Sequence, residues 1–260
     1  MGTIRERKEI NDLSLPPNDF RIIVYGDYAC YTRPELKTER VSYDVPTPGA
    51  IEGMLKAIYW KPSMRFVVDE IVVFNPIRFL SIRRNEVKEK VSMQKMKAKM
   101  EGKDRDPSIY RESCINQRYS LILRDVKYGI RFHIELTGFR SDRGTESIDK
   151  HVEIMDRRLK NGQFFKKPCF GCSEYPVQKV DYLKGDSFPL DEVSPEIKEK
   201  NDVDLGFMLY QLEFADKGIP VNHNWNHPVF SDTIRGGRFY RPHMVSGVID
   251  VQKYRREALW

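Results

Sequence analysis

The feature that most constrains the fold is a stretch of strictly alternating residues near the middle of the chain, at positions 126–136. Apolar side chains occupy every second position, namely Val126, Tyr128, Ile130, Phe132, Ile134 and Leu136. The intervening positions hold Lys127, Gly129, Arg131, His133 and Glu135. A period of two over eleven residues is the pattern of a β-strand with one face on a core. The segment therefore predicts a sheet whose second face carries cations and a histidine.

Two other segments have the apolar spacing of amphipathic helices. In the first, Thr47 suits the N-cap, Pro48 suits the first helical position, and Lys61-Pro62 ends the helix. Its apolar stripe consists of Ile51, Met54, Leu55 and Ile58. The second helix runs from about 147 to 160 and ends at Asn161-Gly162.

The order of the predicted elements indicates the fold class. Further strands are predicted at 20–25, 64–74, 77–82 and 207–214. We expect 77–82 to pair back on 64–74. Strand, helix, strand, insertion, strand, helix, strand is βαββαβ, the ferredoxin-like pattern. In that fold both helices cover one sheet face, and RNA-recognition modules bind single-stranded RNA on the other.

We therefore predict an α+β chain built around one ferredoxin-like domain. The predicted parts are a leader at 1–19, the ferredoxin-like domain at 20–215 with a basic insertion at about 83–118, and a smaller C-terminal β extension at 216–260.

The charge distribution suggests a partner. The chain has 44 basic and 38 acidic residues, a net charge of +6. Residues 83–105 alone hold nine basic and four acidic residues, so most of the surplus lies in this tract. A concentrated basic excess favours a polyanionic partner, because neutralising phosphates releases counterions. A solvated lysine-rich insertion explains the same charge equally well.

Several classes of protein are excluded. No apolar run approaches the ~18 residues of a membrane helix, because Arg65, Asp69 and Glu70 interrupt the best stretch. The N-terminus lacks the apolar core of a secretory signal. Four cysteines are too few for a disulfide scaffold, so reduced thiols and a cytoplasmic location are expected.

No nucleotide or metal motif stands out. The Walker pattern GxxxxGK[ST] and the Rossmann pattern GxGxxG are absent. Cys169 and Cys172 have CxxC spacing, but Cys30 and Cys114 form no matching pair, so a surface turn is expected there. We predict no metal and no other cofactor.

The remaining candidates suit metal-free RNA cleavage. Tyr59 ends the first helix, and His133 lies two residues from Arg131 on the polar strand face. RNA carries its own nucleophile, the 2′-hydroxyl, so cleavage needs a base, a cation for the phosphorane charge and in-line positioning. The alternative is that Tyr59 covers a core edge and that His133 and Arg131 form a surface pair.

Several short motifs together resemble one family. They are Tyr25-Gly26-Asp27-Tyr28-Ala29-Cys30, Thr32-Arg33-Pro34-Glu35, residues 39–46 (ERVSYDVP), Ala57-Ile58-Tyr59-Trp60-Lys61-Pro62, residues 83–87 (RRNEV), Phe132-His133-Ile134-Glu135-Leu136, Lys150-His151 and residues 168–172 (PCFGC). In this order, from about residue 21 to 176, they are similar to the CRISPR-associated Cas-five family, subtype I-C. The C-terminal third matches only loosely.

This resemblance implies a repeat-associated (RAMP) protein with a ferredoxin-like domain and a metal-independent endoribonuclease activity. The family enzyme cuts precursor CRISPR RNA at the base of the repeat hairpin, leaves a 2′,3′-cyclic phosphate and stays on the 5′ handle within Cascade. The implied partners are the repeat RNA and crRNA 5′ handle, the large and backbone subunits of Cascade, and target DNA near the PAM, with no membrane. In other subtypes, family members are non-catalytic handle-binding scaffolds, which is the main alternative. A generic single-stranded RNA binder is a third possibility.

The resemblance also implies site residues. Tyr59 and His133 match the family's tyrosine and histidine, and the basic member is Arg131 or Lys127. We expect His133 to act as the general acid–base and Tyr59 to orient the 2′-hydroxyl or phosphate. The candidates for phosphate contacts are Arg33, Lys37, Arg40, Lys61, Arg83 and Arg84.

Overall fold

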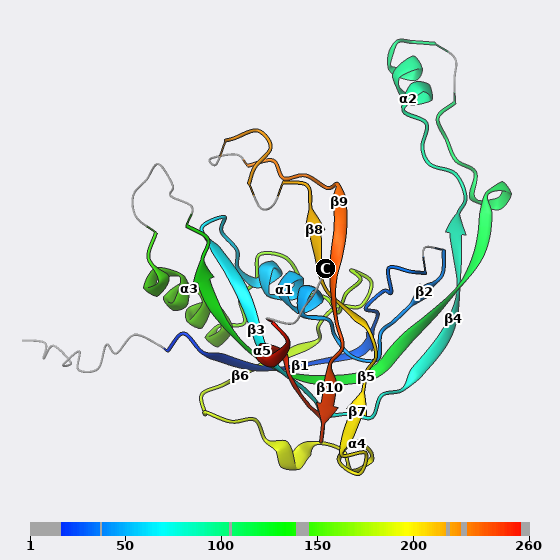
Figure 1. Cartoon of the computed structure of the whole chain (residues 1–260). Helices are drawn as coiled ribbons and strands as arrows, with labels where there is room; N and C mark the ends of the chain where they lie inside the picture. The colour runs from blue at the N-terminus through cyan, green and yellow to red at the C-terminus, as the bar shows by residue number, and fades with distance from the viewer. Residues whose placement is uncertain are drawn as a thin grey trace, which may run out of the picture.

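The alternating segment forms the second half of β5 (Ile115–Leu136), the strand at the centre of the main sheet. We describe the chain from a computed structural model (Figure 1), which covers residues 17–36, 38–103, 106–138, 146–216, 219–224 and 228–255. Most of the predicted leader and Lys37 lie outside these residues. No helix within them is long and apolar enough to span a bilayer.

The core of the fold is ferredoxin-like, as predicted. β1 (Phe20–Ala29) and β3 (Met64–Val73) pair antiparallel with β5 on its two sides, and β6 (Lys179–Leu183) pairs with the outer edge of β1. The order is therefore β6-β1-β5-β3. α1 (Pro48–Ile58) connects β1 to β3, and α3 (Ile148–Lys160) connects β5 to β6.

Both helices form where the sequence predicts them. The Thr47 side chain accepts a hydrogen bond from Ala50 N and caps α1, with Pro48 at the first helical position. Ser147 caps α3 in the same way through Lys150 N. The predicted apolar stripe of α1 is buried. The spacing of apolar residues therefore predicted both the position of this helix and the side of it that packs on the core.

The helices cover one face of the sheet. Phe132 of β5 is fully buried and stacks on Phe20 at 5.1 Å between ring centroids. Phe20 also contacts Tyr182 of β6, whose hydroxyl donates to Asp156 of α3 at 3.0 Å. In the second half of β5, even-numbered residues thus lie on the face that α3 covers, and odd-numbered residues lie on the other face.

The second face is more covered than predicted. Phe188 packs on β5 so closely that a Cβ at Gly129 would lie 2.9 Å from its ring. Further along, α5 (Val251–Tyr254) packs beside β3. The segment carrying Phe188 continues through η2 (Leu190–Glu192) to α4 (Pro195–Lys198). The expectation of an open RNA-binding sheet face is therefore wrong around Gly129.

Two strand assignments also need correction. The fourth ferredoxin strand is β6, whereas β8 (Met208–Phe214) pairs with β9 (Ile234–Tyr240) in a separate two-stranded sheet. β4 (Phe79–Val87) pairs with the first half of β5 and not with β3. The free edge of β3 is taken instead by β11 (Val248–Asp250).

The C-terminal strands complete the main sheet. β10 (His243–Val245) pairs with β11 and with β7 (Asp202–Asp204). A short β2 (Arg40–Val41) adds a parallel pairing to β5. The predicted domain boundary after residue 215 stays a prediction, but the strands at 243–250 belong to the same sheet as the ferredoxin-like core.

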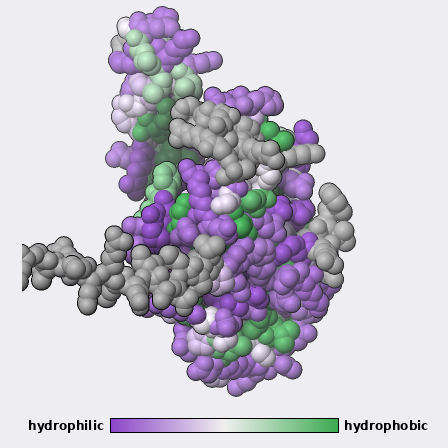
Figure 2. All heavy atoms as spheres, turned by 90° about the vertical axis from the view of Figure 1, so that its left-hand side faces the viewer, coloured by the Kyte–Doolittle hydropathy of each residue, from purple (hydrophilic) through white to green (hydrophobic). Residues whose placement is uncertain are grey.

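The predicted basic insertion forms the outer part of a projecting β4–β5 ribbon. α2 (Met93–Met100) lies at its tip, and η1 (Arg111–Ser113) leads back into β5 (Figure 1). No residue of α2 is buried. Seen from the α3 side, the molecule is mainly hydrophilic, and the ribbon at the top mixes hydrophobic and hydrophilic residues (Figure 2).

Candidate active site

Tyr59 lies at the junction of α1 with the loop that leads to β3. It is the C-cap of α1, in an extended conformation, and its N–H donates to Leu55 O. The side chain is buried, and its hydroxyl lies 2.9 Å from Nδ1 of His151 in α3. The two helices of the ferredoxin-like core are thus joined by a tyrosine–histidine hydrogen bond.

His151 is held at both ring nitrogens. Its Nε2 lies 3.1 Å from Ser63 Oγ and 3.4 Å from a Glu146 carboxylate oxygen. Burial lowers the pKa of His151, so the ring is neutral at physiological pH. Because a carboxylate only accepts hydrogen bonds, the arrangement favours a proton on Nε2 and leaves Nδ1 to accept from the Tyr59 hydroxyl.

Cations surround this pair. The Arg158 guanidinium lies 5.3 Å from the Tyr59 ring centroid and donates to Ile58 O. Lys150 binds Glu146 at 3.0 Å, and Lys61 and Lys150 both act on His151 to lower its pKa, in addition to burial. Burial raises the pKa of Tyr59 to about 12, with Glu146 adding to the rise, so the phenol remains a hydrogen-bond donor at neutral pH.

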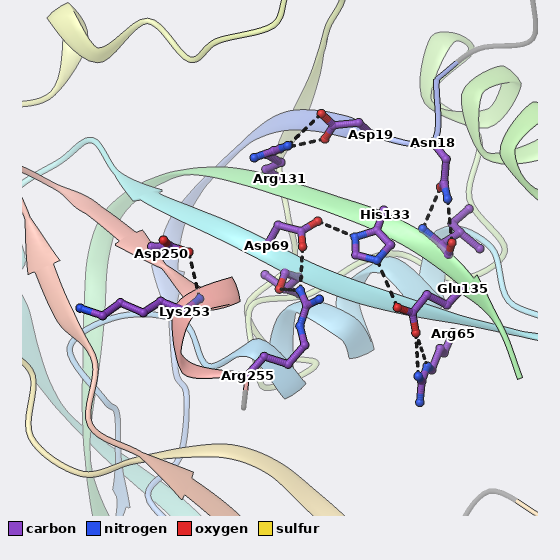
Figure 3. Close-up of polar contacts among 12 residues, drawn as sticks. Asn18, Asp19, Arg65, Asp69, Arg131, His133, Glu135, Asp250, Lys253 and Arg255 are labelled. Carbon is purple, nitrogen blue, oxygen red and sulfur yellow. Dashed lines mark hydrogen bonds and ion pairs between the residues drawn. The ribbon is translucent and has the colours of Figure 1, made fainter. Parts of the chain in front are cut away.

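His133 lies elsewhere. As an odd-numbered residue of β5 it faces away from the helices, and its Nδ1 is 2.6 Å from Asp69 Oδ2 (Figure 3). Asp69 also accepts from Arg255 at 2.6 Å, next to α5. His133 Nε2 lies 3.4 Å from Glu135, which pairs with Arg65. The structure therefore does not bring Tyr59 and His133 together, because the sheet separates them.

The two predicted cations are also remote from Tyr59. Arg131 forms a two-point ion pair with Asp19, at 2.9 and 3.2 Å (Figure 3). Lys127 binds Glu192 at 2.5 Å and lies over the Phe74 ring. Within the described residues, the cation over the Tyr59 ring is Arg158 instead.

The candidates for phosphate contacts differ in whether their charge is already paired with a carboxylate. Arg33 pairs with Asp44, and Arg40 and Arg84 share the carboxylate of Glu174. Arg83 is exposed on the ribbon with its guanidinium 5.2 Å from the Tyr119 ring centroid. Lys61 is exposed beside the Tyr59–His151 pair. Lys37 lies outside the described residues, and of the five candidates that the structure describes, Lys61 is the one beside this pair.

The contact of His151 with Tyr59 was not predicted from residue spacing, although Lys150-His151 is among the motifs that carry the family resemblance. A usable signal exists. His151 falls three residues after Ile148 and four before Met155, so it lies on the apolar stripe of the helix. A titratable side chain on a buried helix face needs a polar partner, and the structure supplies Tyr59 and Ser63.

The CxxC segment is a turn, as expected. Cys169 pairs with Pro176 in an isolated bridge, and Cys172 Sγ donates to Cys30 O at 3.5 Å. Its thiols are free. Among the residues the structure describes, no three histidine, cysteine or carboxylate side chains gather as metal ligands.

The strand order and helix placement define a ferredoxin-like protein of the RAMP class. A family model described as CRISPR-associated protein (Cas_Cas5), of the Cas5d type, matches residues 21–252. The chain therefore belongs to the Cas5 family, subtype I-C.

Two curated proteins are similar over most of the chain. One from Mannheimia succiniciproducens, named CRISPR pre-crRNA endoribonuclease Cas5d, is 38% identical over 244 residues, covering 93% of this chain and 98% of that protein. A protein of the same name from Thermus thermophilus is 35% identical over 201 residues, covering 77% and 76%.

Solved structures share the fold. A crystal structure described as a CRISPR-associated protein superposes with a TM-score of 0.54 at 25% identity, covering 89% of this chain and 90% of that one. A functionally uncharacterized protein from Streptococcus mutans superposes with a TM-score of 0.55 at 23% identity over the same shares. This second similarity concerns the fold alone.

Proposed function

We propose that this chain is an endoribonuclease that cleaves precursor CRISPR RNA at the repeat hairpin. The observation that carries the proposal is the hydrogen bond between Tyr59 and a neutral His151. Lys61 and Lys150 lie close enough to lower the pKa of His151, and the Arg158 guanidinium lies over the Tyr59 ring. Two relatives that match most of the chain are named for this activity.

The chemistry follows from the site. The 2′-hydroxyl attacks the adjacent phosphorus, its proton is taken by a base, and the 5′-oxygen leaves with a proton, which gives a 2′,3′-cyclic phosphate. The neutral His151 imidazole can take up the first proton at Nδ1 by way of the Tyr59 hydroxyl, which donates to Nδ1 while it accepts from the 2′-hydroxyl. The same proton can then return along this route to the leaving 5′-oxygen. The Tyr59 phenol can hold the 2′-hydroxyl or a phosphate oxygen in line, and the lysines and Arg158 can stabilise the phosphorane charge. His151 thereby takes the role first predicted for His133.

The experiment uses the purified chain and the repeat RNA of the same organism in millimolar EDTA. We expect one cut, a 3′ product end that resists ligation until the cyclic phosphate has been opened and the phosphate removed, and no cut when the nucleotide 5′ of the scissile phosphate is 2′-deoxy. Cleavage that requires added magnesium, or that proceeds on the deoxy substrate, would contradict this mechanism.

A non-catalytic handle-binding subunit is the second candidate. One observation favours it: the His151 side chain is fully buried and Tyr59 is 4% exposed, as expected of a structural pair. Binding of repeat RNA with no cleavage under single-turnover conditions would support this reading. In either case we propose that the chain stays on the crRNA 5′ handle as a Cascade subunit, beside the large and backbone subunits.

A further inference from the structure

A short loop beside Tyr59 presents two phenylalanine rings to solvent. Phe164 is 54% exposed and Phe165 is 86% exposed. They belong to the loop at 161–167, which follows α3 and in which every residue is exposed. Single exposed apolar residues are ordinary. Two adjacent phenylalanine side chains in a loop whose residues are all exposed are less common and need an explanation.

The loop is fixed to the candidate active site by its backbone. Phe165 N donates to Ala57 O at 3.0 Å and to Ile58 O at 3.3 Å, and Lys166 N donates to Ala57 O at 2.9 Å. These are the last carbonyls of α1, directly before Tyr59. At its start, Gln163 N donates to Arg158 O at 2.9 Å. The backbone of Phe165 is therefore tied to the end of α1 next to Tyr59, while its side chain stays 86% exposed.

The surroundings of the rings are strongly cationic. Residues 157–173 contain five basic side chains and no acidic one: Arg157, Arg158, Lys160, Lys166 and Lys167. Among the residues that the structure describes, Lys160 is the only one of these five with a carboxylate partner, Asp156 at 2.7 Å. Aromatic faces between unneutralised cations are the combination that binds single-stranded nucleic acid, with bases stacked on the rings and phosphates held by the cations.

We propose that Phe165, with Phe164 beside it, is a stacking platform for an unpaired base of the RNA next to the scissile phosphate, and that Lys166 and Lys167 bind the flanking phosphates. This inference rests on the proposed function, since it names how the substrate is positioned at the same site. Phe165 is a positioning residue: it places the nucleotide and takes no part in proton transfer.

The test is a binding measurement that does not depend on cleavage. The probe is the repeat RNA of the same organism with a 2′-deoxy nucleotide at the cleavage site, so that it binds but is not cut. We expect Phe165→Ala to weaken affinity by about 5- to 100-fold, the range for loss of one stacked base, with an unchanged salt slope. Phe165→Trp should restore affinity, and Lys166→Gln with Lys167→Gln should flatten the salt slope.

Phe207→Ala is the matched control, because Phe207 is 71% exposed and also lies near a guanidinium, that of Arg241, but belongs to the β8 side of the molecule. It should bind as the wild type does. A series of RNA probes, each with one abasic nucleotide, locates the stacked base. When the missing base is the one that stacks on Phe165, the wild type should bind the probe more weakly than the intact RNA. The Phe165→Ala variant has already lost this stacking, so its affinity should be the same for that probe and for the intact RNA.

The outcomes separate the two proposals. If the wild type binds and cuts repeat RNA while Phe165→Ala keeps wild-type affinity, the platform is wrong and the proposed function stands. If Phe165→Ala lowers the affinity by the same factor for every abasic probe, the ring contacts something other than a base, and the proposal of a stacking platform is again wrong. If the wild type neither binds nor cuts the RNA, both proposals fail.

Discussion

At the scale of single residues, the surroundings of a histidine decide what it can do. His133 lies 2.6 Å from a carboxylate that also holds Arg255, so it ties β5 to β3 and to the residue that follows α5. His151 is buried among a phenol, a hydroxyl and a carboxylate, with lysines close enough to lower its pKa. A neutral ring beside cations suits proton transfer near a phosphate, whereas a ring bound to Asp69 suits cross-linking.

The two histidines can be separated by substitution. We expect His151→Asn to reduce single-turnover cleavage by about 10²–10⁴-fold, the usual contribution of general acid–base catalysis. His133→Ala is the control and should cut at nearly the wild-type rate. Tyr59→Phe, which keeps the buried ring, should also lose cleavage. It leaves His151 Nδ1 without its partner, which costs about 1–3 kcal/mol of stability. If instead His133→Ala loses cleavage and His151→Asn cuts at the wild-type rate, the sequence-based assignment of His133 as the general acid–base is correct.

Burial of His151 also makes a prediction about pH. Because its pKa is lowered from 6.5 in the folded chain, the unfolded chain takes up a proton first as the pH falls. The stability that the neutral ring provides is complete above pH 6.5 and declines below it, by at most about 1.4 kcal/mol per pH unit. Denaturant unfolding should be measured at pH 7.5 and at pH 5.5. The free energy of unfolding should fall less between these two pH values for His151→Gln than for the wild type. Equal losses would place the ring in solvent.

At the scale of elements, regular periodicity was the reliable guide. The cap and apolar stripe of α1, the range of α3 and the alternation in β5 all predicted structure that formed. β6 was missed because its five residues, KVDYL, are all partly exposed and lie in a segment rich in proline and glycine. The partner of β4 could not be predicted because β11, from the far end of the chain, occupies the edge of β3.

Contacts between distant parts of the chain also limit what could be predicted of the site. The alternation in β5 correctly predicted that His133 and Arg131 share one face of the sheet. Only the tertiary structure shows that Tyr59 contacts α3 on the other face. The hydrogen bond from Tyr59 to His151 joins residues 92 positions apart. No local pattern encodes a contact of that range.

The ribbon tip gives a prediction at this scale. α2 buries nothing, and Lys95, Lys97 and Lys99 project from it, so replacing all three by glutamine should leave thermal stability unchanged. If the tip contacts RNA, affinity for all sequences should fall, and the slope of log K against log salt should flatten by up to about one unit per lost contact. Lys184→Gln with Lys200→Gln, at exposed positions of another surface segment, is the charge control. An unchanged slope would mean that the tract is a solvated insertion.

At the scale of the whole molecule, the sheet joins distant parts of the chain into one body. β11 binds the edge of β3, and Arg255, just after α5, reaches Asp69 in the same strand. Phe188 closes the second face over Gly129. The basic ribbon and the cationic loop at 161–167 are therefore both carried by one framework, so an RNA that spans them would be held at several points.

Such multipoint binding predicts that the cut RNA is not released. Cleavage removes one phosphodiester but leaves the phosphate and base contacts to the 5′ handle in place, so the off-rate of the handle should remain slow. With RNA in excess, we expect a burst of about one product equivalent per protein, followed by slow turnover. Raising the salt should accelerate turnover before it abolishes binding, because the phosphate contacts weaken with ionic strength. Burst amplitude and filter binding of the isolated handle measure the two effects. Steady multiple turnover at low salt, with weak handle binding, would show that the chain releases its product and would contradict a lasting place on the guide RNA.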